Sequence, residues 1–107
     1  MDEQLNLFDF IGYPSIYDLD EEEIADIIGG VLGVTFAPAK QSWRGLVAKV
    51  GPIELELKKA DNYRNEPGRV WLDIGYTYKN KTGGGGLGAE SIEEAIRYFK
   101  KKVEMTT

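Results

Sequence analysis

The sequence predicts a two-layer α+β domain in which two amphipathic helices cover one face of a three-stranded antiparallel sheet. Two stretches carry apolar residues at helical spacing, and three others carry them at every second position, as half-buried strands do. The resulting order is α-β-β-β-α, and consecutive strands with short connections favour a meander. An N-terminal arm precedes these elements, so we expect an arm over residues 1–17 and a single domain over residues 18–104.

The first helix is expected to begin near Asp18 or Asp20 and to end at Gly33. Asp20 and Glu23 have the spacing of a capping box, in which each side chain accepts a hydrogen bond from the other residue's backbone N–H. A glycine such as Gly33 readily adopts the left-handed conformation that ends many helices. Two earlier glycines weaken the last turn, so an alternative stays open in which the helix stops at Ile28. The apolar stripe of this helix consists of Ile24, Ile27, Ile28, Val31 and Leu32.

Three strands are expected at residues 43–50, 53–59 and 70–79. The second is the clearest, because Glu54 and Glu56 alternate with apolar residues and so indicate one wet and one buried face. The apolar positions that should face the core are Leu46, Ala48, Val50, Ile53, Leu55, Leu57, Val70, Leu72, Ile74, Tyr76 and Tyr78.

The second helix is expected to begin at Ser91, which has the spacing of a capping box with Glu94. Its apolar stripe consists of Ile92, Ala95, Ile96, Phe99 and Val103. Residues 34–42, which include the helix breaker Pro38, and the glycine run of residues 83–88 are expected to be connectors. A phosphate-binding loop is disfavoured for the glycine run, because acidic residues follow it and no Lys-Ser/Thr pair does.

The composition disfavours several classes of function. The chain of 107 residues has no histidine, which removes the commonest general base and the commonest transition-metal ligand. It also has no cysteine, which excludes disulfides and is compatible with a reducing cytoplasm. No apolar run approaches the roughly 20 residues of a membrane span, and no signal peptide opens the chain. We therefore expect a cytoplasmic, non-enzymatic protein with no catalytic residues, metal or cofactor, acting away from membranes.

Charge is distributed unevenly along the chain. Residues 1–39 contain nine acidic residues and no basic one, whereas residues 40–107 contain nine acidic and thirteen basic residues. Many of the early acids lie where a helix dipole favours negative charge, which explains them without a partner. The alternative is an inhibitor that fits the basic nucleic-acid groove of another protein, in the style of anti-restriction or anti-CRISPR proteins. The acidic face of such an inhibitor would consist of Asp18, Asp20, Glu21, Glu22, Glu23 and Asp26.

Aromatic residues are numerous, and Trp71 is the one whose position is most informative. It falls on the face of its strand opposite Leu72 and Ile74, which are expected in the core. An exposed tryptophan at that position would indicate a protein interface, including that of a homodimer. The alternative is that the N-terminal arm folds across this face and covers Trp71.

The α-β-β-β-α order resembles that of the double-stranded-RNA-binding domain, with the segment from Trp43 to Val103 covering the strands and the last helix. Residues 86–91 are similar to that family's glycine-rich approach to its last helix. The family places lysines at the start of this helix to bind phosphates, whereas acidic residues stand there in this chain, namely Glu90, Glu93 and Glu94. The resemblance is one of topology, and direct nucleic-acid binding is not expected.

Near its N-terminus the chain reads Gln4-Leu5-Asn6-Leu7-Phe8, which resembles the bacterial sliding-clamp-binding peptide. The family's pattern is Gln-Leu, a small polar residue that is commonly Ser or Asp, and Leu-Phe, so this chain departs from it only at Asn6. The resemblance implies that Gln4 occupies a polar subsite with Leu5 beside it, and that Leu7 and Phe8 fill an apolar pocket between two clamp subdomains. It also implies a bacterial setting, which suits a small accessory protein of a bacterium, phage or mobile element. The alternative is an apolar arm that pairs with a sheet edge or packs on the core.

Overall fold

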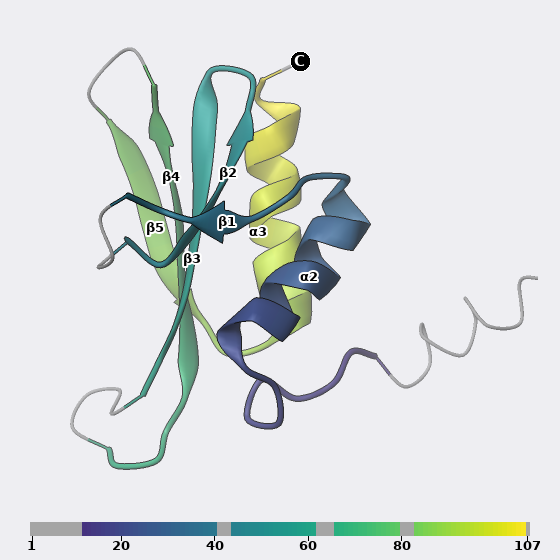
Figure 1. The fold of residues 1–107 in the computed structure, drawn as a ribbon, viewed down its shortest axis with the longest axis vertical. Coiled ribbons are helices and arrows are strands. Elements are labelled where there is room, and N and C mark those ends of the chain that lie inside the picture. Colours follow the sequence, from purple (N-terminus) through teal and green to yellow (C-terminus); the bar gives the residue numbers. More distant parts are fainter. Residues whose placement is uncertain (1–11, 41–43, 62–65, 80–82, 107) are drawn as a thin grey trace, which may run out of the picture.

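The computed structural model describes residues 12–40, 44–61, 66–79 and 83–106, which form two layers (Figure 1). One layer is an antiparallel sheet of five strands in the order β1-β2-β3-β4-β5, and helices α2 (Glu21–Leu32) and α3 (Ile92–Glu104) pack on one of its faces. The strands are β1 (Ala37–Pro38), β2 (Leu46–Val50), β3 (Ile53–Ala60), β4 (Trp71–Tyr78) and β5 (Gly84–Ala89). The predicted α+β class is confirmed, but the sheet has five strands where three were predicted.

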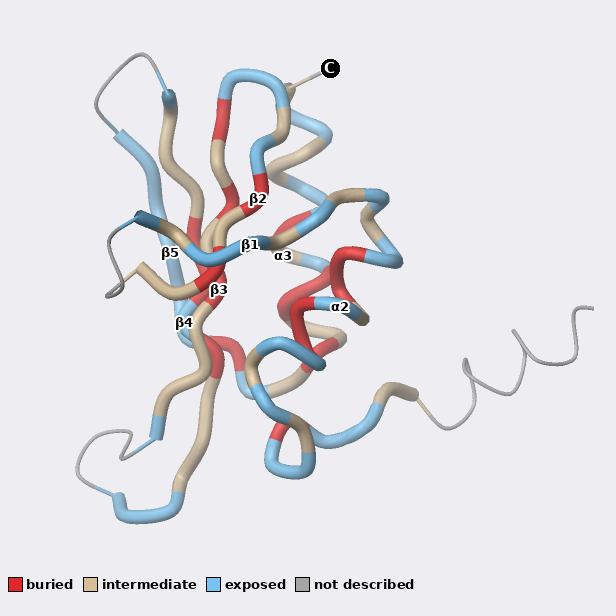
Figure 2. Tube along the Cα trace, in the orientation of Figure 1, coloured by how far each residue is buried: buried red, intermediate tan, exposed pale blue. Residues whose placement is uncertain are grey.

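The core lies between the sheet and the helices, where alternate positions of the central strands are buried (Figure 2). In β3 the buried positions are the predicted ones, and the glutamates between them are only partly covered. The segment before α2 contributes Ile16, which is 1% exposed. The buried apolar residues are Ile16, Ile24, Ala25, Ile28, Leu46, Ala48, Ile53, Leu55, Leu57, Leu72, Ile74, Ala89, Ile92, Ala95, Ile96 and Phe99. Burial of each large side chain in this set contributes roughly 1.5–3 kcal/mol.

Helix α2 begins with the predicted capping box. Asp20 Oδ1 accepts a hydrogen bond from the backbone N–H of Glu23 at 2.8 Å, and Glu23 Oε1 accepts one from the backbone N–H of Asp20 at 3.0 Å. The helix continues to Leu32, so the alternative in which it stops at Ile28 is wrong. Gly33 ends it with φ of 74°, as predicted, because only glycine adopts this conformation without steric cost.

The chain turns back sharply over the last turn of α2 at Gly29. The carbonyl of Gly29 accepts hydrogen bonds from the N–H groups of Gly33 at 2.8 Å and of Val34 at 3.0 Å. A Cβ atom on Gly29 would lie 2.5 Å from the carbonyl oxygen of Val34, whereas one on Gly30 would meet nothing within 4 Å. Close packing therefore requires a glycine at Gly29, whereas the position of Gly30 has room for a side chain.

Substitution of these two glycines by alanine should have opposite effects on stability. Gly29→Ala is expected to lower the free energy of unfolding by about 1–3 kcal/mol, because the carbonyl that it meets is backbone and cannot rotate away. Gly30→Ala is the matched control and is expected to raise that free energy by up to about 1 kcal/mol, through better helix propensity. Urea denaturation measures both, and an equal gain for the two variants would contradict the close contact at Gly29.

Strand β5 corrects the prediction that the glycine run is a connector. Residues Gly84–Ala89 pair with β4 over six positions, with Gly86 opposite Gly75. A Cβ atom on Gly84 or Gly86 would lie only 2.2 Å or 2.8 Å from a carbonyl oxygen of β4, so this close pairing needs glycine. Sequence patterns did not predict β5, because glycine has a low strand propensity. That propensity reflects how side chains pack in a sheet, and glycines have no side chain to pack.

Two strand boundaries and one helix cap also differ from the predictions. The connector predicted at residues 34–42 contains the short edge strand β1, where Pro38 is tolerated because an edge strand leaves some N–H groups unpaired. Strand β2 begins at Leu46, after Gly45 with φ of 76°, and Trp43 lies outside the described residues. At α3, Ser91 Oγ accepts the N–H of Glu94 at 3.1 Å as predicted, but the Glu94 carboxylate accepts the N–H of Glu90 at 2.9 Å.

Neither described helix has the length and apolar character needed to cross a membrane.

Candidate functional site

The face of the sheet opposite the helices is called the open face here, and both described helices lie on its other side (Figure 1). Strand register determines which residues share it. Glu56 lies opposite Gly75, which lies opposite Gly86, while Lys58 lies opposite Asp73, which lies opposite Gly88. The open face therefore carries charged residues on β3 and bare backbone on β5.

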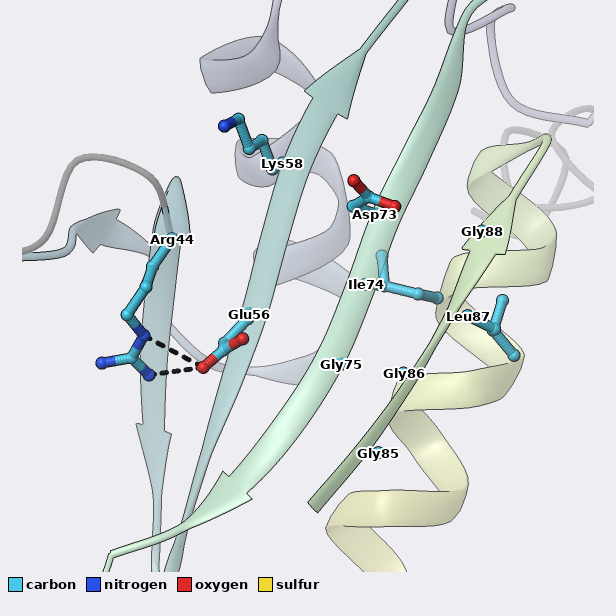
Figure 3. A pocket seen from close by; sticks show the side chains of 10 residues that line it. All are labelled: Arg44, Glu56, Lys58, Asp73, Ile74, Gly75, Gly85, Gly86, Leu87 and Gly88. Atoms are coloured by element: carbon cyan, nitrogen blue, oxygen red, sulfur yellow. Dashed lines mark hydrogen bonds and ion pairs between the residues drawn. The ribbon is translucent and has the colours of Figure 1, made fainter. Parts of the chain in front are cut away.

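Arg44 holds the two glutamates of β3 on the open face. Its Nε and Nη2 atoms donate to Glu56 Oε2 (Figure 3). The Nη2 atom also donates to Glu54 Oε1 at 3.0 Å. These hydrogen bonds, first that with Glu56 and then that with Glu54, raise the pKa of Arg44 above its ordinary value despite partial desolvation. The predicted wet face of β3 is thus a paired cluster, in which both carboxylates are held by one guanidinium group.

A shallow hollow of about 470 Å³ lies beside this cluster on the open face (Figure 3). Its lining consists of Arg44, Glu56, Lys58, Asp73, Ile74, Gly75, Gly85, Gly86, Leu87 and Gly88. The glycines expose backbone over the part of the hollow formed by β4 and β5, so a partner can approach the main chain closely there. Its size falls within the range of ligand pockets, but its lining consists mainly of charged residues and glycines and includes no aromatic residue, unlike the lining of most such pockets.

Trp71 lies at one end of the open face and is half-buried. Its Nε1 atom donates a hydrogen bond to Asp73 Oδ1 at 2.9 Å. Its Cδ1 atom lies 3.1 Å from the Cβ position that Gly88 would have, so the indole ring covers that glycine. Leu72 and Ile74 are buried on the opposite face, as the alternation predicts. The use of Trp71 as an interface residue stays a prediction.

Both acidic residues that line the hollow accept hydrogen bonds from neighbouring side chains. Glu56 accepts hydrogen bonds from Arg44, and Asp73 accepts one from Trp71. In the parts of the chain that the structure describes, no group of three or more Asp, Glu, His or Cys residues is arranged to hold a metal ion. The hollow can offer a partner hydrogen bonds and a concave surface.

Three of the six residues of the predicted acidic face make hydrogen bonds that stabilise the fold. Asp20 and Glu23 form the capping box, and Glu21 Oε1 accepts the backbone N–H of Lys59 in β3 at 2.8 Å. The other three acids, Asp18, Glu22 and Asp26, are exposed. Glu22 and Asp26 are one turn apart on the same side of α2, so they form the part of the acidic face that is available to a partner.

The clamp-type residues Gln4, Leu5, Leu7 and Phe8 lie outside the described residues. The chain just after them is fixed to the domain at several points. The backbone N–H of Tyr13 donates to Glu93 Oε2 at 3.0 Å, and Tyr17 Oη accepts the N–H of Val70 at 3.1 Å. With the burial of Ile16 between them, these contacts fix the first described residues against the domain, near the start of α3.

Sequence reasoning did not identify Arg44 or the glycines that line the hollow, which are Gly75, Gly85, Gly86 and Gly88. The alternation in residues 53–59 identified Glu54 and Glu56. Two neighbouring carboxylates on one face of a strand repel each other, so a cation is expected near them. Arg44 fills that role only because β2 pairs with β3, a fact that the sequence does not contain. The glycines of β4 and β5 meet only through strand register.

No protein-family model, curated protein or solved structure matches this chain.

Proposed function

We propose that this protein is a non-enzymatic accessory protein that binds protein partners and docks on the bacterial replication sliding clamp through Gln4-Leu5-Asn6-Leu7-Phe8. The observation that carries the proposal is the match of this segment to the clamp-binding peptide at four of its five positions. Leu7 and Phe8 supply the paired apolar anchors on which such a short contact depends. The proposal implies that the protein acts in the cytoplasm of a bacterium. Its gene would belong to that bacterium, to a phage or to a mobile element.

The fixed position of Tyr13 limits how far the domain could lie from a clamp bound at Phe8. Phe8 is five residues before Tyr13, so the intervening chain spans at most about 17 Å when fully extended. The domain would therefore stand close to the clamp surface instead of trailing on a long linker. Ordering the segment costs conformational entropy, so we expect weak binding, in the micromolar range or above.

The open face is the surface that we propose for a second protein partner. Trp71 is half-buried there beside a hollow whose glycines leave the backbone accessible. Tryptophan is enriched among residues that dominate binding energy at protein interfaces. The protein would thus bring that partner to the clamp. Direct binding of nucleic acid is not part of the proposal, because Glu90, Glu93 and Glu94 stand where a phosphate-binding helix would carry cations.

The clamp proposal is tested by fluorescence anisotropy with a labelled peptide of residues 1–10, titrated with a bacterial sliding clamp and then competed by the full chain. We expect micromolar binding of the peptide, competition by the full chain, and at least a tenfold loss of competition for the full chain with Leu7→Ala and Phe8→Ala. No binding at a clamp concentration of about 1 mM, which corresponds to roughly −4 kcal/mol, would contradict the proposal.

A charge-reversal variant separates this proposal from the inhibitor alternative. Glu22→Lys with Asp26→Lys is the suitable pair, because these acids are exposed, whereas Glu21 and Glu23 hold structural hydrogen bonds. Clamp docking through Leu7 and Phe8 should tolerate this reversal and depend only modestly on salt. An acidic inhibitor of a nucleic-acid-binding protein would lose its activity on the same reversal and depend strongly on salt.

A further inference from the structure

Strand β5 forms one edge of the sheet. It pairs with β4 on one side, and no other strand among the described residues pairs with it on the other. Its sequence, Gly-Gly-Gly-Leu-Gly-Ala, contains no charged residue and no proline, and all positions except Ala89 are exposed. Natural proteins usually block such an edge with charge, proline or a covering segment, because its N–H and C=O groups invite another strand.

Leu87 is the one side chain of β5 that is larger than a methyl group. It lies opposite Ile74 and therefore on the helix-covered face of the sheet, yet it is 40% exposed because β5 is the outermost strand. A further strand beside β5 would cover it. The position of this leucine near the middle of the edge indicates where an added strand would gain most apolar contact.

We propose that β5 pairs antiparallel with β5 of a second copy of this chain, about a twofold axis perpendicular to the sheet at Leu87. Such an axis keeps both helix layers on the same side of one continuous sheet. Paired residues must then share a face, so Leu87 lies opposite Leu87 of the second copy and Gly86 opposite its Gly88. This register buries both exposed leucines against each other, and it brings no like charges together along β5.

The charges of α3 are complementary in this arrangement. Helix α3 runs antiparallel to β5 (Figures 1 and 3), with acidic residues in its first turn and lysines in its last. Its lysine end flanks β5: a Cβ atom on Gly85 would lie 3.9 Å from Tyr98 Oη, and Lys102 Nζ is 5.0 Å from the Tyr98 ring. The twofold axis reverses the second copy, so the acidic end of one α3 faces the lysine end of the other.

A second copy fits these features better than an unrelated strand does. A self-pairing partner places a leucine opposite Leu87 and the reversed charge pattern opposite α3 without any residue from outside this chain. The pairing needs no sliding clamp, so its success or failure is independent of the proposed function.

Engineered cysteines test the register, since the chain has no cysteine of its own. Leu87→Cys should form a disulfide-linked dimer when treated with oxidised glutathione, because directly opposed residues meet the Cα separation that a disulfide allows. Gly85→Cys is the register control: two such cysteines would lie four positions apart, about 13 Å along the strands. Val31→Cys is the exposure control, because Val31 is 41% exposed but lies on α2.

We expect the wild-type chain to sediment as a dimer at about 100 µM, and Leu87→Cys alone to cross-link efficiently. Leu87→Lys, which places two ammonium groups across the axis, should weaken the dimer at least tenfold while Val31→Lys leaves it unchanged. Circular dichroism checks that each variant is folded. A wild-type monomer at that concentration, or cross-linking of Val31→Cys or Gly85→Cys as efficient as that of Leu87→Cys, would overturn the proposal.

Discussion

Replacing Phe99 with alanine is expected to lower the free energy of unfolding by about 3–5 kcal/mol. Phe99 is 0% exposed and lies where α3 meets the rest of the core. Its ring contacts those of Phe36 and Tyr98, each with a centroid separation of 5.8 Å. Truncation removes these contacts and leaves a cavity, because residues held by α2, α3 and the sheet cannot all move in to fill it. The loss is comparable to the whole stability of many small domains.

The measurement is urea denaturation followed by circular dichroism, with Met105→Ala as the control. Met105 is 55% exposed just after the end of the same helix, so its truncation should change the free energy of unfolding by less than about 0.5 kcal/mol. Similar losses for the two variants would mean that α3 does not pack as described.

Gly75→Ala is the second substitution from which we expect a large effect, a loss of about 1–3 kcal/mol in the free energy of unfolding. Standard strand propensity predicts a small gain from this change. Here the new methyl group would lie 2.6 Å from the Gly85 carbonyl oxygen and 3.4 Å from the Gly86 Cα atom. Both neighbours are backbone of β5, so relief requires that β5 move away from β4.

The matched control is Gly85→Ala on the facing strand. A Cβ atom there would meet only side chains, Tyr76 at 3.4 Å and Tyr98 at 3.9 Å, so we expect a gain of up to about 1 kcal/mol. Hydrogen exchange of the β5 amides adds a local measurement, and Gly75→Ala should raise their exchange rates more than those of β2. If Gly75→Ala is as stable as Gly85→Ala, the close approach of the two strands is wrong.

Sequence reasoning succeeded for elements whose side chains report their environment. The capping box of Asp20 and Glu23 identified the start of α2, and alternation identified both faces of β3. It failed for β5, because glycine has no side chain with which to record a buried and an exposed face. It failed for β1 because a two-residue strand is too short to show any period.

Only those features of the candidate site that depend on residues close together in the sequence could be predicted. Glu54 and Glu56 were assigned to a wet face, but their pairing with Arg44 follows from a hairpin that brings residues ten and twelve positions apart together. The bond between Glu21 and the backbone of Lys59 joins residues 38 positions apart. No window of sequence reveals such a contact, and that is why the acidic face appeared more available than it is.

The hydrogen bond from Tyr13 to Glu93 spans 80 positions and ties the start of the described chain to its last helix. Phe99 and Ala95, which complete the core, lie in that same helix. During synthesis on a ribosome, the core therefore cannot close until α3 has left the exit tunnel. Strands β2, β3 and β4 emerge before that moment, so for part of translation the apolar face of the sheet lacks one of the two helices that cover it.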